Sequence, residues 1–176
     1  MIRPSPTPTR AGLGRVAWTR GEGCRDLAHL LADDPIRIEG DLRASCIDRR
    51  VELLVARKLT SFDLVPVVVA HDLDRAGVAS VTAAVAEGPH SGLVARVAGA
   101  LARGLEVPGE FATVVREPDE RADARRRLES LHDRHPGMTL RIVERPTAAG
   151  LVETLAEDAL LVVGAAGGSW LQRQLL

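Results

Sequence analysis

From residue 78 onward, short apolar segments rich in β-branched residues alternate with longer segments of helical period. Residues 78–86, 110–115, 138–143 and 159–164 are predicted to be buried strands. Parallel strands need long crossovers, which helices supply with a right-handed sense. The alternation therefore predicts an α/β fold: an open parallel sheet with helices on both faces, Rossmann-like in its general plan.

The segments between these strands have the features of helices. Residues 91–105 carry a one-sided apolar stripe and have Gly104 near their end. Residues 118–135 start with a proline and two acids and stop at Pro-Gly. In this helix three arginines are predicted to lie largely on the solvated side: Arg125, Arg126 and Arg127. Thr147 is predicted to cap a third helix, whose apolar stripe is Ala148, Leu151, Val152, Leu155 and Ala156.

Residues 1–75 have a less regular pattern. Residues 1–14 are rich in Pro, Thr, Ser and Gly, so we expect a disordered arm. Residues 15–75 form a segment of uncertain fold. It is predicted to hold a helix at 24–34, a short strand at 35–40, a longer helix at 41–59 and a buried strand at 64–71. The stripe of the longer helix would be Ile47, Val51, Leu54 and Val55.

Composition excludes several classes of function. The net charge is −1 and aromatic residues make up 2% of the chain, so neither an electrostatic field nor stacking platforms favour nucleic acid. No apolar run reaches the ~18 residues of a membrane span, and no signal peptide is visible. Cys24 and Cys46 lack metal or CxxC spacing, which indicates a reducing compartment and thiols that act as small apolar residues. We therefore expect a cytoplasmic protein.

The glycine cluster after the last predicted strand is a candidate anion site. Open parallel sheets bind ligands beyond the carboxyl ends of their strands, which selects the turns at 87–91 and 164–169. Gly164, Gly167 and Gly168 permit close approach, and Ser169 would cap a following helix whose first N–H groups favour an anion. The alternative is that these glycines only make a tight turn. The sequence lacks the Gly-Lys-Ser/Thr of a P-loop.

The stretch VVGAAGGSWLQRQLL resembles the signature of the universal stress protein family. That signature is Gly, two residues, Gly, nine residues and then Gly-Ser or Gly-Thr, at the end of the fourth strand. Gly164 and Gly167 match its first two positions. The final pair would start at 177, one position after the last residue of the sequence. The order of elements over 78–176 agrees with the same family.

The resemblance implies a small three-layer α/β sandwich, often a homodimer, of which one branch binds ATP with Mg. Gly164, Gly167, Gly168 and Ser169 would hold the phosphates. Glu87, Gly88 and Ser91 would face the ribose, with Ala86 or Glu87 in place of the family's aspartate. The absent Gly-Ser would remove half of the phosphate cradle. The absent fifth strand would remove the usual dimer edge and leave the fourth strand open.

Three hypotheses concern the segment that precedes residue 78. Residues 22–71 could be the remnant of a preceding tandem domain, or they could pack as a substitute edge on the sheet of 78–163. The helix-then-strand pattern of 52–71 is compatible with both, and an unrelated helical cap is a third alternative.

The leading functional hypothesis is a stress-protein-like module that binds adenine nucleotide and signals through association. One alternative is a dimerisation or interaction module of the same fold without nucleotide. The other is a nucleotide-activating enzyme, for which EGPHSG is a poor pyrophosphate loop. The sequence presents no catalytic pair with convincing spacing and no metal site. His132 and His135 lack a third ligand, and we expect them in the last turn of a helix, where imidazolium suits the negative end.

Overall fold

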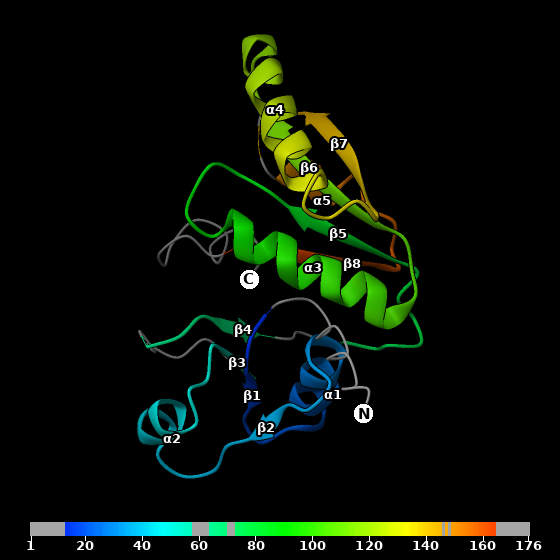
Figure 1. Cartoon of the computed structure of the whole chain (residues 1–176). Helices are drawn as coiled ribbons and strands as arrows, with labels where there is room; N and C mark the ends of the chain where they lie inside the picture. Colours follow the sequence, from blue (N-terminus) through cyan, green and yellow to red (C-terminus); the bar gives the residue numbers. More distant parts are fainter. Residues whose placement is uncertain (1–12, 58–63, 70–72, 146, 148, 165–176) are drawn as a thin grey trace, which may run out of the picture. The chain divides into compact units, whose positions relative to one another are not determined.

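The chain divides into two units, Met1–Leu73 and Asp74–Leu176, each with its own sheet of four parallel strands (Figure 1). The computed structural model describes residues 13–57, 64–69, 73–145, 147 and 149–164. Of the predicted disordered arm, residues 1–12 lie outside this description, whereas Leu13 is buried.

The second unit follows the strand–helix alternation predicted from residue 78. It contains β5 (Ser80–Ala84), α3 (Ser91–Leu105), β6 (Gly109–Val115), a 3-10 turn (Pro118–Glu120), α4 (Arg121–His132), β7 (Met138–Glu144), α5 (Ala149–Val152) and β8 (Ala159–Val163). All strand pairs are parallel, and the sheet order is β7-β6-β5-β8. The bounds of α3 coincide with the predicted 91–105.

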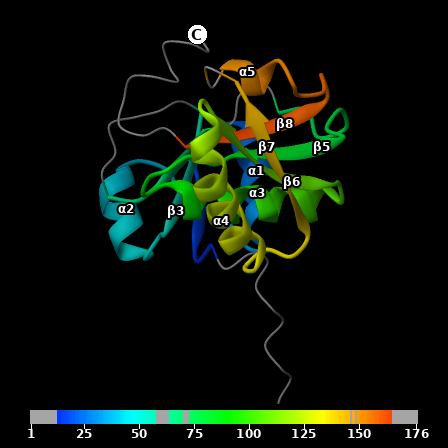
Figure 2. The ribbon, with the colours of Figure 1, turned by 90° about the horizontal axis from the view of Figure 1, so that it is seen from above.

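Helices cover both faces of this sheet. Successive strand residues point to opposite faces. Phe111 of β6 meets His135, just after α4, edge to face with ring centroids 5.8 Å apart. The next residue, Ala112, packs with Val143 against Leu151 of α5. The α4 side and α5 therefore lie on opposite faces, and Figure 2 shows α4 over β6 and β7. The predicted fold class, an α/β open parallel sheet with helices on both faces, is confirmed.

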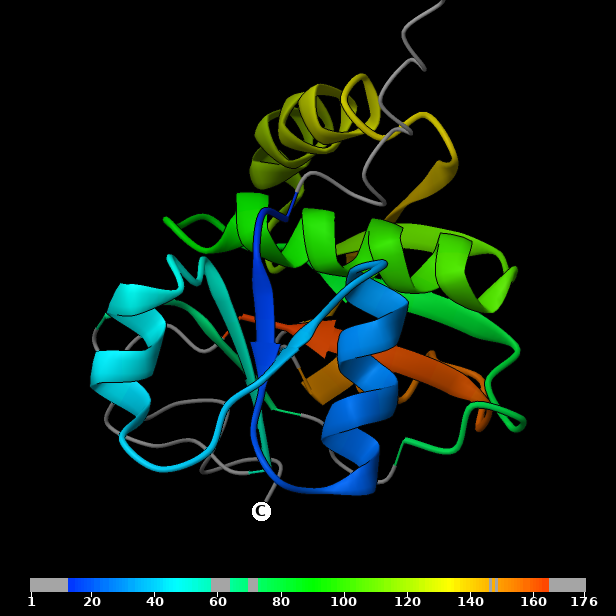
Figure 3. The same cartoon turned by 60° about the horizontal axis from the view of Figure 1, so that its bottom comes forward.

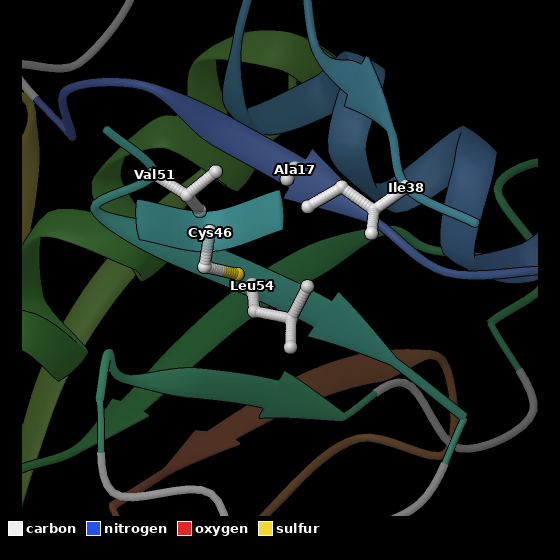
Figure 4. Close-up of a cluster of buried hydrophobic side chains, with 5 residues drawn as sticks. All are labelled: Ala17, Ile38, Cys46, Val51 and Leu54. Atoms are coloured by element: carbon white, nitrogen blue, oxygen red, sulfur yellow. The ribbon is translucent and has the colours of Figure 1, made fainter. Parts of the chain in front are cut away.

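The first unit is built on the same principle with a different strand order. It contains β1 (Val16–Trp18), α1 (Glu22–Leu31), β2 (Ile36–Arg37), α2 (Leu42–Asp48), β3 (Leu53–Ala56) and β4 (Val67–Val69). Its sheet order is β2-β1-β3-β4, again all parallel. Helix α1 packs along β1 and β3 (Figure 3). One core cluster joins Cys46 of α2 to the sheet, together with Ala17, Ile38, Val51 and Leu54 (Figure 4).

The predicted helix over 41–59 is wrong in its second half. Asp41 caps α2 by accepting hydrogen bonds from the N–H groups of Arg43 (2.9 Å) and Ala44 (3.1 Å). The helix ends at Asp48, and Arg50 adopts a left-handed φ of 52° that turns the chain. The run VELLVA then forms β3, whose four residues are all buried. Ile47 is 57% exposed, so the predicted apolar stripe does not exist.

Strand β1, which has three residues, is absent from the prediction. It is one of the two inner strands of the first sheet. The hypotheses that residues 22–71 are a remnant of a tandem domain or a substitute edge on the sheet of 78–163 stay predictions. Strand β4 pairs with β3 in the first sheet, through Leu54 and Val67 among others. The first unit is thus an α/β unit in its own right.

The helix predicted after Thr147 is much shorter than expected. The N–H of Gly150 donates to the carbonyl of Thr147 at 3.1 Å, and Leu151 is buried against the sheet. Further on, the N–H of Thr154 donates to the carbonyl of Leu151 at 3.0 Å, an i to i+3 contact that tightens the chain and ends the helix. Leu155 lies beyond α5 and does not continue its face.

Candidate functional site

The strand order of the second sheet reverses between β5 and β8, which makes the carboxyl ends of these two strands the expected place for a ligand-binding crevice. Residue Ala84 of β5 is paired with Val163 of β8. Gly164 follows directly, and a Cβ added there would lie 3.0 Å from Cγ2 of Val94 and 3.2 Å from Cβ of His90. The end of β8 therefore lies against the start of α3. In open α/β sheets this is the position at which ligands bind.

The turn after β5 supplies the other predicted residues. Gly88 has a φ of 149°, which favours glycine, and nothing lies within 4 Å of a Cβ added there. Ser91 begins α3 and its hydroxyl donates to the carbonyl of Ala86, so it fixes the turn. The side chain of Glu87 is 91% exposed. The structure thus brings Glu87, Gly88, Ser91 and Gly164 to the end of the sheet where the strands have their carboxyl ends.

Three predicted phosphate-binding residues lie outside the described residues: Gly167, Gly168 and Ser169. The predicted cradle as a whole therefore stays a prediction. Its first glycine, Gly164, is half-buried at the end of β8. At the start of α3, His90 makes no side-chain cap hydrogen bond, and the N–H of Ser91 donates to the carbonyl of Gly88 at 3.4 Å.

Arg127 is a charged residue of this edge whose predicted position is wrong. The sequence predicts it on the solvated side of its helix, but its side chain is only 30% exposed. Its Nη2 atom lies 3.9 Å from Oε2 of Glu87, in the turn after β5. The signal is present in the sequence, because Arg127 occupies the i+3 position of the buried stripe formed by Ala124 and Leu128.

The two histidines of the α4 region make separate contacts. Nδ1 of His132 lies 2.7 Å from the carbonyl oxygen of Met138. His135 lies beyond the end of α4 and packs on Phe111, so its predicted place in the last helical turn is wrong. Burial lowers the pKa of His135, and Arg103, Arg134 and Arg96 lower that pKa further. Among the described residues no group of three His, Cys, Asp or Glu side chains could hold a metal ion.

A polar cluster occupies the opposite end of the same sheet. Glu110 Oε1 accepts from Thr82 Oγ1 at 2.7 Å and from Arg141 Nη2 at 2.6 Å. Nη1 of Arg141 also reaches Thr154, with its carbonyl oxygen at 3.3 Å and its Oγ1 at 3.1 Å. These residues line a cleft of about 290 Å³ near the amino ends of the strands. The cluster joins β5, β6 and β7 to the segment after α5, which is a structural role.

The first unit has an edge of the same kind. Its strand order reverses between β1 and β3. Gly21 separates β1 from α1 with a φ of 141°, and a Cβ added there would lie 3.1 Å from Cδ of Arg57. Cys24, near the start of α1, and Cys46 are buried free thiols whose pKa values are raised by burial. Their predicted behaviour as small apolar residues is confirmed.

The fold and this edge define a class: α/β proteins with open, all-parallel, Rossmann-like sheets. Comparison of the chain with protein-family models, curated proteins and solved structures finds no match. Of the helices in the described residues, none has the length and apolarity that crossing a membrane requires.

Proposed function

We propose that the unit Asp74–Leu176 binds an adenine nucleotide at the carboxyl ends of β5 and β8. The observation that supports this proposal is the contact between the two predicted turns. Gly164 matches the first glycine of the universal stress protein signature, and it lies against His90 at the start of α3. A nucleotide that spans the crevice between β5 and β8 would meet both turns at once.

The roles of the residues are those that the resemblance to universal stress proteins implies. Gly164, Gly167, Gly168 and Ser169 would hold the phosphates of Mg-ATP, because glycines leave backbone N–H groups open to an anion. Gly88 and Ser91 would shape the ribose end, and Glu87 would accept hydrogen bonds from ribose hydroxyls. The chemistry proposed is binding, and the biological role is a stress-response or signalling module that acts in the cytoplasm as a homodimer.

The test is a thermal-unfolding titration of the full chain with Mg-ATP. A ligand that binds only the folded state stabilises it by about 2.7 kcal/mol at a concentration of one hundred times its Kd. We expect millimolar Mg-ATP to raise the unfolding temperature of the wild type. Gly167→Val should abolish the rise and keep the fold, because its side chain would fill the space for the phosphate.

Gly137→Val is the matched control, since nothing lies within 4 Å of a Cβ added at Gly137 in the turn before β7. This variant should keep the full response to Mg-ATP. No rise with the wild type would remove the proposal, and an undiminished rise with Gly167→Val would show that the phosphate cradle lies elsewhere.

One observation favours the alternative, an interaction or dimerisation module of the same fold that binds no nucleotide. Glu87, which with Ala86 is one of the two candidates for the place of the family's aspartate, has its Oε2 atom 3.9 Å from Nη2 of Arg127. A carboxylate neutralised by a guanidinium is a weaker acceptor for ribose hydroxyls. A wild-type protein that is dimeric by sedimentation yet unaffected by Mg-ATP would support this alternative.

A further inference from the structure

Arg127 is held differently from the other arginines of α4. Arg125 pairs with Glu129 at 2.9 Å on the exposed face, and its side chain is 74% exposed. Arg126 pairs with Asp123 and is 70% exposed. Arg127 is only 30% exposed, because it lies beside the buried stripe of Ala124, Leu128 and Leu131. Its guanidinium is therefore directed towards the turn after β5 instead of into bulk solvent.

The partner of Arg127 leaves it available to a stronger anion. Glu87 is 91% exposed and its Oε2 lies 3.9 Å from Nη2 of Arg127, which is at the limit of an ion pair. Exposed pairs of this kind contribute little free energy, since water screens them and the long side chains lose entropy. A phosphomonoester offers three acceptor oxygens and about two negative charges. Such a group would displace Glu87 from Arg127.

The position of this pair determines which part of a nucleotide it would meet. Glu87 follows β5, at the end of the crevice assigned above to the ribose. In Rossmann-like sites an acidic residue at the ribose accepts from free hydroxyls, whereas an arginine accommodates a phosphate on the ribose. Here the two kinds of residue stand side by side, and the guanidinium is the more firmly held of the two.

We propose that Arg127 makes this site selective for adenine nucleotides that carry a phosphate on the ribose, at the 2′ or the 3′ oxygen. The inference rests on the proposed function, because it assigns the ribose end of the same crevice. Arg127 would pair with the ribose phosphate, and Glu87 would swing into solvent.

The test is calorimetric titration of the full chain with AMP, adenosine 2′,5′-bisphosphate and adenosine 3′,5′-bisphosphate, with Mg-ATP titrated in parallel. We expect one of the bisphosphates to bind the wild type about fivefold more tightly than AMP, the gain of one partly exposed charge-assisted pair. Arg127→Met should bring this ratio close to one. Arg126→Met, from the exposed face of the same helix, should keep it.

Glu87→Gln adds a change in the opposite direction. It removes the competing carboxylate, so the ratio of bisphosphate to AMP affinity should rise above the wild-type value. A ratio that is equal in wild type and Arg127→Met overturns the inference. If Mg-ATP binds in that case, the proposed function survives alone. If neither Mg-ATP nor any other nucleotide binds, the proposed function fails and the inference fails with it.

Discussion

His135 shows how one side chain can make stability depend on pH. Its ring packs edge to face on Phe111. The positive charges of Arg103, Arg134 and Arg96 also act on the ring. Burial, first, and these arginines, second, lower its pKa below the 6.5 of an unperturbed histidine. In the unfolded chain the same ring takes up a proton near that ordinary pKa.

The unfolded state thus binds more protons than the folded state below about pH 6.5, so stability falls as the pH falls. The contribution of neutral His135 to the free energy of unfolding is complete above about pH 6.5. It is lost as the pH falls towards the lower pKa of the folded state. We expect the wild type to lose more stability between about pH 7 and 5 than His135→Gln does. Thermal unfolding across this range measures the difference.

His29→Gln is the control, because His29 is exposed at the end of α1 in the first unit. It should keep the pH dependence of the wild type. An equal slope in wild type and His135→Gln would contradict the assignment to this residue.

Single residues also mark what the sequence can and cannot reveal about the site. Gly164 is predicted at the end of a buried strand, and it is found there against α3. The prediction for Arg127 is wrong, because a run of three arginines suggests a solvated face unless their phase relative to Leu128 is considered. The contact between Arg127 and Glu87 joins α4 to a turn far earlier in the sequence, and no local pattern encodes it.

At the scale of elements, a helix or strand is predicted correctly where its apolar residues fit only one periodicity, helical or extended. Helix α3 has eight buried residues between Val94 and Ala102, interrupted only by Arg96, and its bounds are predicted correctly. The run VELLVA satisfies both a helical stripe and a fully buried strand, and only tertiary pairing with β1 decides for β3. Strand β2 lies within the strand predicted at 35–40, whereas β1 has three residues, too few for any period to show.

The cluster around Glu110 and Arg141 stabilises the arrangement of several elements. Glu110 and Arg141 have side-chain exposures of 24% and 30%, so removal of one partner leaves a charge that is poorly hydrated. We expect Arg141→Met to destabilise the second unit by about 1–3 kcal/mol. The double variant Glu110→Gln/Arg141→Met should cost less than the two single changes together, because each single change leaves one charge without its partner and the double change leaves neither.

Urea unfolding followed by circular dichroism measures these free energies of unfolding. The matched pair is Arg125 and Glu129, which are 74% and 50% exposed and should couple by about 0.5 kcal/mol or less. Coupling of Glu110 with Arg141 no larger than that of the exposed pair would refute a stabilising role for the cluster.

On the scale of the whole molecule, each of the two units has its own sheet and its own cluster of buried residues. Leu54 is fully buried in the cluster that joins α2 to the first sheet. We expect Leu54→Ala to destabilise the first unit by about 2–5 kcal/mol through the cavity it leaves. Native-state hydrogen exchange should then show faster exchange in β1 and β3, while β5 and β6 keep their protection.

The reciprocal change is Phe111→Leu, which reduces the largest fully buried side chain of the second unit. It should raise exchange in β5 and β6 and leave β1 and β3 unchanged. Faster exchange in all four strands after either substitution would mean that the units unfold together.

The pairing of β5 with β8 sets an order of assembly during synthesis. Strand β5 can join β6 as soon as α3 and β6 have emerged from the ribosome, but β8 is the last strand of its sheet to be made. The closure of so long a loop costs chain entropy before the contact gains anything. The pair of β5 with β8 is therefore the last strand pair of that sheet to form, and a nascent chain that lacks β8 would expose one side of β5.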